Sequence, residues 1–230
     1  MLLNPAPTEL TTAATDAALG LLCAGLLLQL RRTPTPTAFR KRVWTWVFGL
    51  IVLASALGAV VHGLALPERA SALLRLPLSL SLGLAVALFL VGAVADWRGE
   101  TAARALVPWA AGLGAGFFAV SETFRGAFLV FVAYEAAALS AALAMYLHLS
   151  LTRRRSGAGL VATGITLSLA AAALQASRLT VHLIVPFDHN GLFHLVQMIS
   201  IVVVARGVRQ GLDARDGSPG TARATGPARG

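Results

Sequence analysis

Apolar residues fill seven long stretches of the chain, and short polar segments separate them. Several of these stretches approach the length of about 20 residues that a helix needs to cross the hydrocarbon core of a bilayer. The predicted spans are residues 9–30, 43–64, 73–95, 105–120, 127–149, 157–184 and 192–204. The sixth is longer than a bilayer requires, so we expect its end to project. The pattern predicts an all-α polytopic membrane protein, a bundle of seven transmembrane helices within residues 1–209.

Composition supports this class of protein. Hydrophobic residues make up 57% of the chain and charged residues only 13%, and the mean hydropathy is +0.73. A net charge of +9 in a soluble protein would suggest nucleic acid as a partner. Here the basic residues lie mostly in short loops and the tail, without interleaved aromatic residues, so we expect no nucleic-acid partner. Cys23 is the only cysteine, which excludes an internal disulfide and a thiolate metal site.

Basic residues also indicate how the bundle is oriented. They concentrate in residues 31–42, in Arg98 and Arg104, in residues 153–155 and in the C-terminal tail, which fall on one side of the bundle. The positive-inside rule then places the N-terminus outside and the C-terminus in the cytoplasm. The tail, residues 210–230, is expected to be disordered because it is rich in Gly, Ala, Arg and Pro. The expected location is a bacterial inner membrane, where the protein contacts the lipid bilayer in several spans.

The segment between the last two spans carries most of the candidate chemistry. It contains His182, Pro186, Asp188, His189, Asn190 and His194. Pro186 is expected to end the preceding helix, and Asp188 or Asn190 is a suitable N-cap for the helix that carries His194. If that helix begins near Asn190, then Asn190 and His194 lie one turn apart on one face.

In the predicted topology, ionisable residues gather at the extracytoplasmic end of the bundle. They are Glu9, Asp16, His62, Arg178, His182, His189 and His194. Ionisable groups in or near the apolar region are costly and commonly mark function. Glu135 lies about 12 Å along the fifth helix from its outer end. A bare carboxylate at that depth needs a partner or a proton, and Arg178 is the candidate partner.

Three imidazoles with nearby carboxylates would suit a zinc ion that keeps one coordination position for water. The hypothesis takes His62, His189 and His194 as zinc ligands, His182 as a reserve ligand and Asp16 as the catalytic residue. The surrounding polar residues would be Glu9, Asp188, Asn190, Glu135 and Arg178. On spacing alone the simpler interpretation is favoured, in which these histidines only form hydrogen bonds to helix ends at the level of the lipid headgroups.

The helix placement resembles a superfamily of seven-span membrane hydrolases that groups alkaline ceramidases, progestin and adiponectin receptors, and glycosylphosphatidylinositol-remodelling proteins. These proteins carry acidic or Asn residues at the start of span one, Ser-x3-His at the end of span two, Asp near the start of span three and His-x3-His at the start of span seven. The matching residues here are Glu9 and Asp16, Gly58 to His62, and Asn190 to His194. Gly58 stands in the place of the serine and Asn190 in the place of the first histidine, and His189 is a substitute for the latter.

Near the predicted start of span three, Ser71 and Arg75 appear and no acidic residue is seen. The resemblance implies zinc-dependent hydrolysis of a lipid amide or ester, with a lipid as the substrate.

Other classes of membrane protein are compared with the hydrolase hypothesis. A retinal protein needs a lysine in its last span, and the only lysine, Lys41, lies in a loop, which excludes that class. His62 with His182 or His194 would supply the axial pair of a b-type haem. A transporter would show internal repeats or broken helices, and no convincing repeat is found. The main alternative is a non-catalytic sensor or binding protein for a small molecule or lipid, because the serine and aspartate of the hydrolases are missing.

Overall fold

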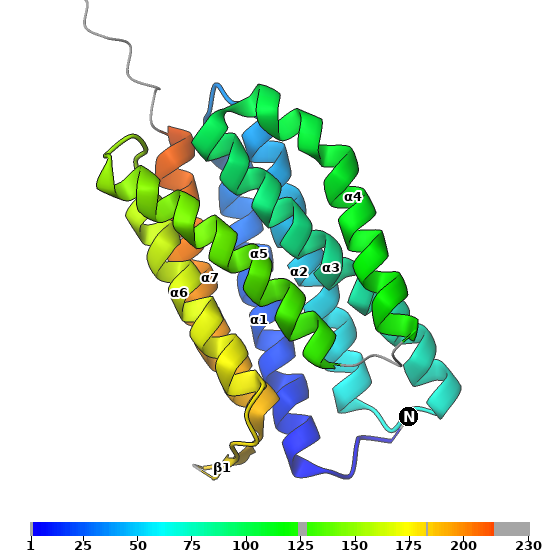
Figure 1. Ribbon diagram of the computed structural model, residues 1–230. Helices are drawn as coiled ribbons and strands as arrows, with labels where there is room; N and C mark the ends of the chain where they lie inside the picture. Colours follow the sequence, from blue (N-terminus) through cyan, green and yellow to red (C-terminus); the bar gives the residue numbers. More distant parts are fainter. Residues whose placement is uncertain (1, 124–127, 183, 214–230) are drawn as a thin grey trace, which may run out of the picture.

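A computed structural model describes residues 2–123, 128–182 and 184–213. The helices in this part of the chain are α1 (Pro7–Arg32), α2 (Ala38–Gly63), α3 (Glu68–Arg98), α4 (Glu100–Thr123), α5 (Phe128–Leu151), α6 (Ala158–Gln175) and α7 (His189–Asp213). Within the described residues, all seven are long and apolar enough to cross a membrane. The predicted all-α class is therefore confirmed, and the helices match the predicted spans in number, length and apolar character (Figure 1).

Six of the helices form a closed ring. Going around it, α1 packs on α2, α2 on α3, α3 on α5, α5 on α6, α6 on α7, and α7 returns to α1. The fourth helix, α4, packs mainly on α3 with a smaller contact to α5, and it lies at the edge of the bundle (Figure 1). The first and last helices are thus neighbours, and the starts of α1 and α7 come together with the end of α2.

The segment after the sixth helix differs most from the prediction. The prediction of one helix over residues 157–184 was wrong, because α6 ends at Gln175. The hydroxyl of Ser177 donates to the carbonyl of Leu174 at 2.6 Å and accepts from the backbone N–H of Leu179. A serine that bonds to the local backbone competes with helical hydrogen bonds and so helps to end the helix.

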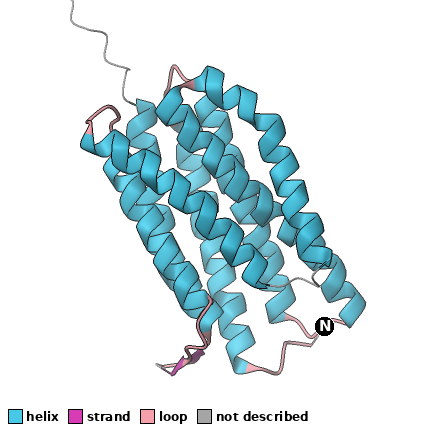
Figure 2. Cartoon of the chain, viewed as in Figure 1, coloured by secondary structure: helices cyan, strands magenta, loops and turns pink. Residues whose placement is uncertain are grey.

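Two short strands follow α6 and pair antiparallel as a hairpin (Figure 2). They are β1 (Val181–His182) and β2 (Pro186–Phe187), with Val181 opposite Phe187. Pro186 was expected to end a helix and instead lies in β2. Valine and phenylalanine favour extended backbone, and proline is tolerated at a sheet edge where its missing N–H is not needed.

The last helix begins where the sequence predicts. The side chain of Asp188 accepts a hydrogen bond from the backbone N–H of Gly191 at 2.8 Å, which is the N-cap interaction expected of this residue. The helix is longer than the predicted 192–204 and includes residues 210–213, which had been assigned to the tail. Residues 214–230 of the predicted disordered tail, and residue 127 at the predicted start of span five, lie outside the described residues.

A buried ionic cluster joins four helices at the end of the bundle opposite His62 and His194. Asp96 of α3 lies 3.4 Å from Nε of Arg40 and 3.2 Å from Nη2 of Arg155, and its other oxygen accepts from the hydroxyl of Tyr146 at 2.7 Å. Arg155 also donates to the carbonyl of Gly211 at 2.7 Å. The cluster therefore fixes α2, α3, α5 and α7 to one another where the basic loops lie.

Candidate binding site

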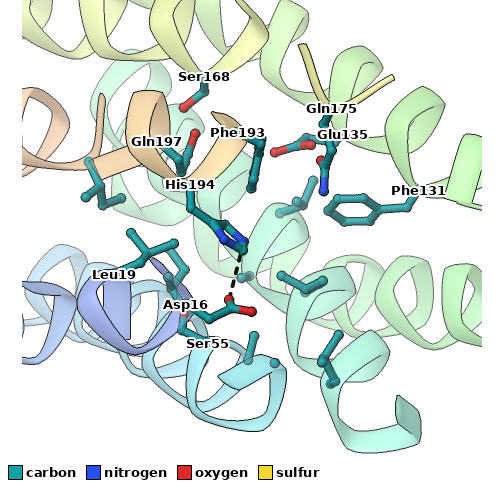
Figure 3. A pocket seen from close by; sticks show the side chains of 18 of the residues that line it. Asp16, Leu19, Ser55, Phe131, Glu135, Ser168, Gln175, Phe193, His194 and Gln197 are labelled. Carbon is teal, nitrogen blue, oxygen red and sulfur yellow. Dashed lines mark ion pairs between the residues drawn. The ribbon is translucent and has the colours of Figure 1, made fainter. Parts of the chain in front are cut away.

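The six-helix ring surrounds a cavity of about 200 Å³. Each of the six ring helices contributes side chains to its wall, and within the described residues α4 contributes none. Most of the wall is made of leucine, valine, isoleucine, alanine and phenylalanine. The polar lining residues are Asp16, Ser55, His62, Glu135, Ser168, Gln175, Asn190, His194 and Gln197 (Figure 3). The cavity is thus apolar with a limited number of polar groups, a composition typical of small-molecule sites.

Asp16 of α1 and His194 of α7 form the central polar contact of the cavity. Oδ1 of Asp16 lies 3.3 Å from Nε2 of His194, as the dashed line in Figure 3 marks. Both residues are buried, with 6% and 8% of their surface exposed. The other ring nitrogen of His194, Nδ1, lies 3.0 Å from the hydroxyl oxygen of Thr15. The sequence analysis expected Asp16 and His194 near each other, and the structure brings them together.

The hydrogen bonds of Thr15 indicate where the protons of this pair lie. Its hydroxyl has one proton and donates it to the carbonyl of Thr12 at 2.9 Å. In this arrangement Nδ1 of His194 is the donor to Thr15, and Nε2 faces Asp16. Asp16 and His194 then share one proton, either as a carboxylic acid beside a neutral imidazole or as a carboxylate beside an imidazolium. Either form leaves the pair without net charge, which lowers the cost of burying it.

Asp188 does not line the cavity, but it helps to position His194, which does. Besides capping α7, its Oδ1 accepts a hydrogen bond from the hydroxyl of Thr12 at 2.9 Å. Thr12 is fully buried on α1, one turn before Asp16. The start of α7 is consequently fixed to α1 at the point that places His194 opposite Asp16.

His62 lines the same cavity from the end of α2. Its Nδ1 lies 2.7 Å from Oε2 of Glu9, and the side chains of the two residues are 24% and 36% exposed. Glu9 is therefore the partner of His62 at the rim rather than a lining residue. His62, Asp16 and His194 line one cavity, but His189, which the sequence analysis grouped with them, is not among its described lining residues. Asp16 pairs with His194, and His62 pairs with Glu9.

Glu135 and two glutamines carry hydrogen-bonding atoms without partners. Oε2 of Glu135, Oε1 of Gln175 and Oε1 of Gln197 are all buried, and none has a hydrogen-bond partner among the described residues. Glu135 itself is only 6% exposed. Gln175 is oriented by Asn190, whose Oδ1 accepts from Nε2 of Gln175 at 3.2 Å. All three are oxygen atoms of side chains that line the cavity, and amide and carboxylate oxygens accept hydrogen bonds.

Besides Glu9 and Asp188, three more of the predicted site residues are not among the described residues that line the cavity. His182 in the hairpin and Arg178 after α6 are exposed, and His189 at the start of α7 is half-buried. Arg178 was a candidate partner for Glu135, and the structure gives no contact between these two residues among those it describes.

The residues do not assemble the expected zinc site. Within the described part of the chain, no group of three or more His, Cys, Asp or Glu side chains gathers closely enough to hold a metal ion. Both ring nitrogens of His194 already contact protein oxygens. The zinc ion with ligands His62, His189 and His194 stays a prediction from the sequence, without support from the geometry.

Position 58 explains one departure from the hydrolase pattern. Gly58 stands where the resembling hydrolases have serine, and the carboxylate of Asp16 lies directly against it. The structure also shows an acidic residue at the start of the third helix, since α3 begins at Glu68, which is exposed. The expectation that no acidic residue lies there was therefore wrong, but Glu68 is not near the cavity wall.

The sequence analysis missed Ser55, Ser168, Gln175 and Gln197. It searched for ionisable residues and motif spacing, and these neutral side chains belong to neither class. A signal was present, because Gln175 and Gln197 each interrupt an apolar helix, and polar side chains in such helices mostly face the bundle interior. Ser168 also has a packing role, as its hydroxyl lies 2.6 Å from that of Ser200 between α6 and α7.

Comparison with known proteins places the chain in a family. The sequence profile of DUF6962, a family of unknown function, matches residues 11–213, which include nearly all of the helical bundle. The chain belongs to this family. No curated protein and no solved structure matches it. The resemblance to ceramidases and adiponectin receptors stays a prediction from the sequence.

Proposed function

We propose that this protein is a multi-pass membrane protein that binds a small amphiphilic molecule in the cavity of its helical ring, as a receptor or sensor rather than as a hydrolase. The observation that carries the proposal is the combination of apolar walls from all six ring helices with three buried acceptor atoms that have no partner among the described residues. Buried polar groups without partners are costly, and a ligand that donates hydrogen bonds removes that cost.

The size of the cavity limits what it can hold. An apolar protein cavity of about 150 Å³ accommodates benzene, so about 200 Å³ corresponds to one ring with a short substituent or to a short chain. A lipid with two long acyl chains would have to leave both outside the ring. The volume therefore supports a small molecule over the lipid substrate that the hydrolase resemblance implies.

The contacts of Asp16 and His194 also support binding over hydrolysis. A general base needs a free acceptor atom directed at the proton it removes. Nε2 of His194 faces Asp16, and Nδ1 faces Thr15. The polar atoms of the pair thus already have partners within the protein. The pair forms a polar part of the cavity wall.

The orientation of the bundle would place this site on the extracytoplasmic side. The positive-inside rule puts residues 31–42 and 153–155 in the cytoplasm, and the Asp96 cluster lies at that end. The cavity residues Asp16, His62 and Asn190 lie toward the opposite end. In a bacterial inner membrane the ligand would then arrive from the periplasm or from the outer leaflet.

The proposal is tested with a panel of single-ring compounds: 2-phenylethylamine, 2-phenylethanol and 3-phenylpropionate. Binding to purified wild type in uncharged detergent is measured by saturation-transfer NMR and by the shift in thermal unfolding. We expect saturable binding of at least one of the three. Ala85→Leu extends a side chain from α3 into the cavity and should weaken that binding about tenfold or more, because a filled cavity excludes the ring.

Ala111→Leu is the matched control. It makes the same change on α4, at an exposed position of the one helix that gives no described lining residue. Binding should be unchanged in this variant. The proposed function fails if no compound binds saturably, or if both variants bind as the wild type does.

A further inference from the structure

We propose that the ligand carries a cationic amine and that Glu135 is the carboxylate that binds it, an inference that rests on the proposed binding function. The first argument comes from the charges of the cavity wall. Its ionisable residues are Asp16, His62, Glu135 and His194. Asp16 is paired with His194, and His62 with Glu9. Glu135 is thus the lining carboxyl group to which the structure gives no ionic partner among the described residues.

The same wall excludes an anionic ligand. No lysine or arginine is found among the described residues that line the cavity. A phosphate or carboxylate in this space would meet the carboxylate of Glu135 without a lysine or arginine to offset the repulsion. Charges of like sign in a buried site disfavour each other strongly, so lipid phosphates and fatty acids do not fit the site.

The surroundings of Glu135 suit an ammonium group. Phe131 lies one turn earlier on the same helix and also lines the cavity, and Figure 3 shows Glu135, Gln175 and Phe131 at one side of the cavity with Asp16 at the other. An ammonium is attracted to the face of an aromatic ring and forms short charge-assisted hydrogen bonds with a carboxylate.

The acceptor oxygens of Glu135 and Gln175 also suit an ammonium group. A primary ammonium has three N–H donors. Glu135 Oε2 and Gln175 Oε1 both lack partners among the described residues. Gln175 uses its amide N–H₂ to donate to Asn190, which leaves the oxygen of the amide available. A bound amine would satisfy both acceptors and would neutralise the carboxylate, while its apolar part contacts leucine and phenylalanine side chains.

The test compares three compounds that share a phenyl ring and differ in their polar group: 2-phenylethylamine, 2-phenylethanol and 3-phenylpropionate. Wild-type protein is reconstituted in nanodiscs of uncharged phosphatidylcholine, so that anionic lipids do not attract the amine. We expect the amine to bind about tenfold or more tightly than the alcohol, because it adds one buried charge-assisted hydrogen bond. The acid should bind most weakly.

Glu135→Gln removes the charge and keeps the shape of the side chain. The affinity for the amine should fall about tenfold or more, whereas the affinity for the alcohol should change less than about threefold. Glu100→Gln is the control, since Glu100 is a carboxylate on α4 outside the cavity, paired with Arg104. It should leave all three affinities unchanged.

A second variant keeps the inference testable if Glu135→Gln does not fold. Phe131→Leu keeps the apolar wall but removes the ring, and it should weaken amine binding about two- to fivefold while sparing the alcohol. Equal affinities for amine and alcohol, or tightest binding of the acid, would overturn the amine inference and leave the proposed function standing. Binding of no compound to wild type would overturn both.

Discussion

The carboxylate of Asp16 on α1 occupies the space beside Gly58 on α2. A Cβ atom on residue 58 would lie 2.5 Å from Oδ2 of Asp16 and 2.8 Å from its Cγ. Any side chain at position 58 must therefore displace the carboxylate that contacts His194. The serine that the resembling hydrolases carry at this position is incompatible with Asp16 where it lies here, so the glycine and the Asp16–His194 pair belong together.

Gly58→Ala should consequently destabilise the protein. We expect the free energy of unfolding to fall by about 1–3 kcal/mol, the usual cost of forcing an extra methyl group into a packed site. The measurement is chemical or thermal unfolding of the purified protein in detergent. Gly49→Ala on the same helix is the control, because no heavy atom lies within 4 Å of a Cβ built there. It should be neutral or stabilising by up to about 1 kcal/mol, since alanine favours helix over glycine.

The double variant Asp16→Ala with Gly58→Ala isolates the contact. Without the carboxylate, the added methyl group has space, so the two losses should not add. Full additivity of the two single changes would show that the contact between Asp16 and Gly58 does not determine the cost.

Much of the bundle could be predicted because lipid imposes a simple pattern. Apolar length identified seven helices that are long enough to span a membrane, and capping chemistry gave Asp188 as one of two candidate N-caps of α7. The placement of charged residues at helix ends was enough to bring Asp16, His62 and His194 to one cavity. Each of these inferences depends on a local rule. Backbone polar groups must form hydrogen bonds within the lipid, and polar side chains stabilise helix N-termini.

Other features depend on tertiary contacts that the sequence pattern does not record. The apolar run after Gln175 has the composition of a helix end or of a strand, and periodicity alone does not separate the two. Asp96 follows the predicted end of span three by one residue, and only the packing of the other helices shows that Arg40 and Arg155 enclose it. The pairing of His62 with Glu9, rather than with a metal, likewise depends on side-chain directions.

Asp96→Ala should destabilise the protein strongly. Removing this carboxylate leaves Arg40 and Arg155 with less compensation in a buried site, where their side chains are 9% and 8% exposed. Removing one partner of a buried ion pair costs about 3–5 kcal/mol. We expect the free energy of unfolding to fall by an amount in that range. Tyr146→Phe removes one hydrogen bond to Asp96 and should cost about 1.5–3 kcal/mol, the range for a bond to a charged group.

Glu100→Ala provides the comparison for Asp96. Its partner Arg104 lies one turn away on the surface of α4, with a distance of 3.2 Å and a side chain that is 59% exposed. Exposed pairs of this kind contribute about 0.3–0.5 kcal/mol. Similar losses for Asp96→Ala and Glu100→Ala would contradict the structural role of the Asp96 cluster.

Gly157 should not tolerate a side chain. It precedes α6 with a backbone φ of +77°, a conformation that other residues adopt at a cost of about 1–2 kcal/mol. A Cβ there would also contact the carbonyl oxygen of Gly207 on α7. Gly157→Ala is expected to lower the free energy of unfolding by about 2 kcal/mol or more. Gly112→Ala on α4, where nothing lies within 4 Å, should cost nothing, and equal effects of the two would refute the argument.

The orientation of the bundle gives a prediction that is independent of ligand. A tag inserted between Pro67 and Arg69, at the start of α3, should be labelled from outside the cell. A reporter fused after Asp213 should be active in the cytoplasm, because the basic segments lie at that end of the bundle. Cytoplasmic labelling of the tag would reverse the orientation and place the cavity on the inner side.

The protonation of His194 can be measured directly. With the hydroxyl proton of Thr15 donated to the carbonyl of Thr12, we expect Nδ1 of His194 to carry a proton, whichever form the pair with Asp16 takes. ¹⁵N NMR of protein labelled at histidine should show one imidazole that is protonated at Nδ1, and its signal should disappear in His194→Gln. Thr15→Val removes the acceptor of that proton, so the signal should shift. Thr11→Val, one turn earlier, removes a hydroxyl that bonds only to the local backbone at Pro7, and it should leave the signal unchanged. If the signal assigned to His194 shows an unprotonated Nδ1, Thr15 donates to the ring instead. The pair with Asp16 would then have a net negative charge.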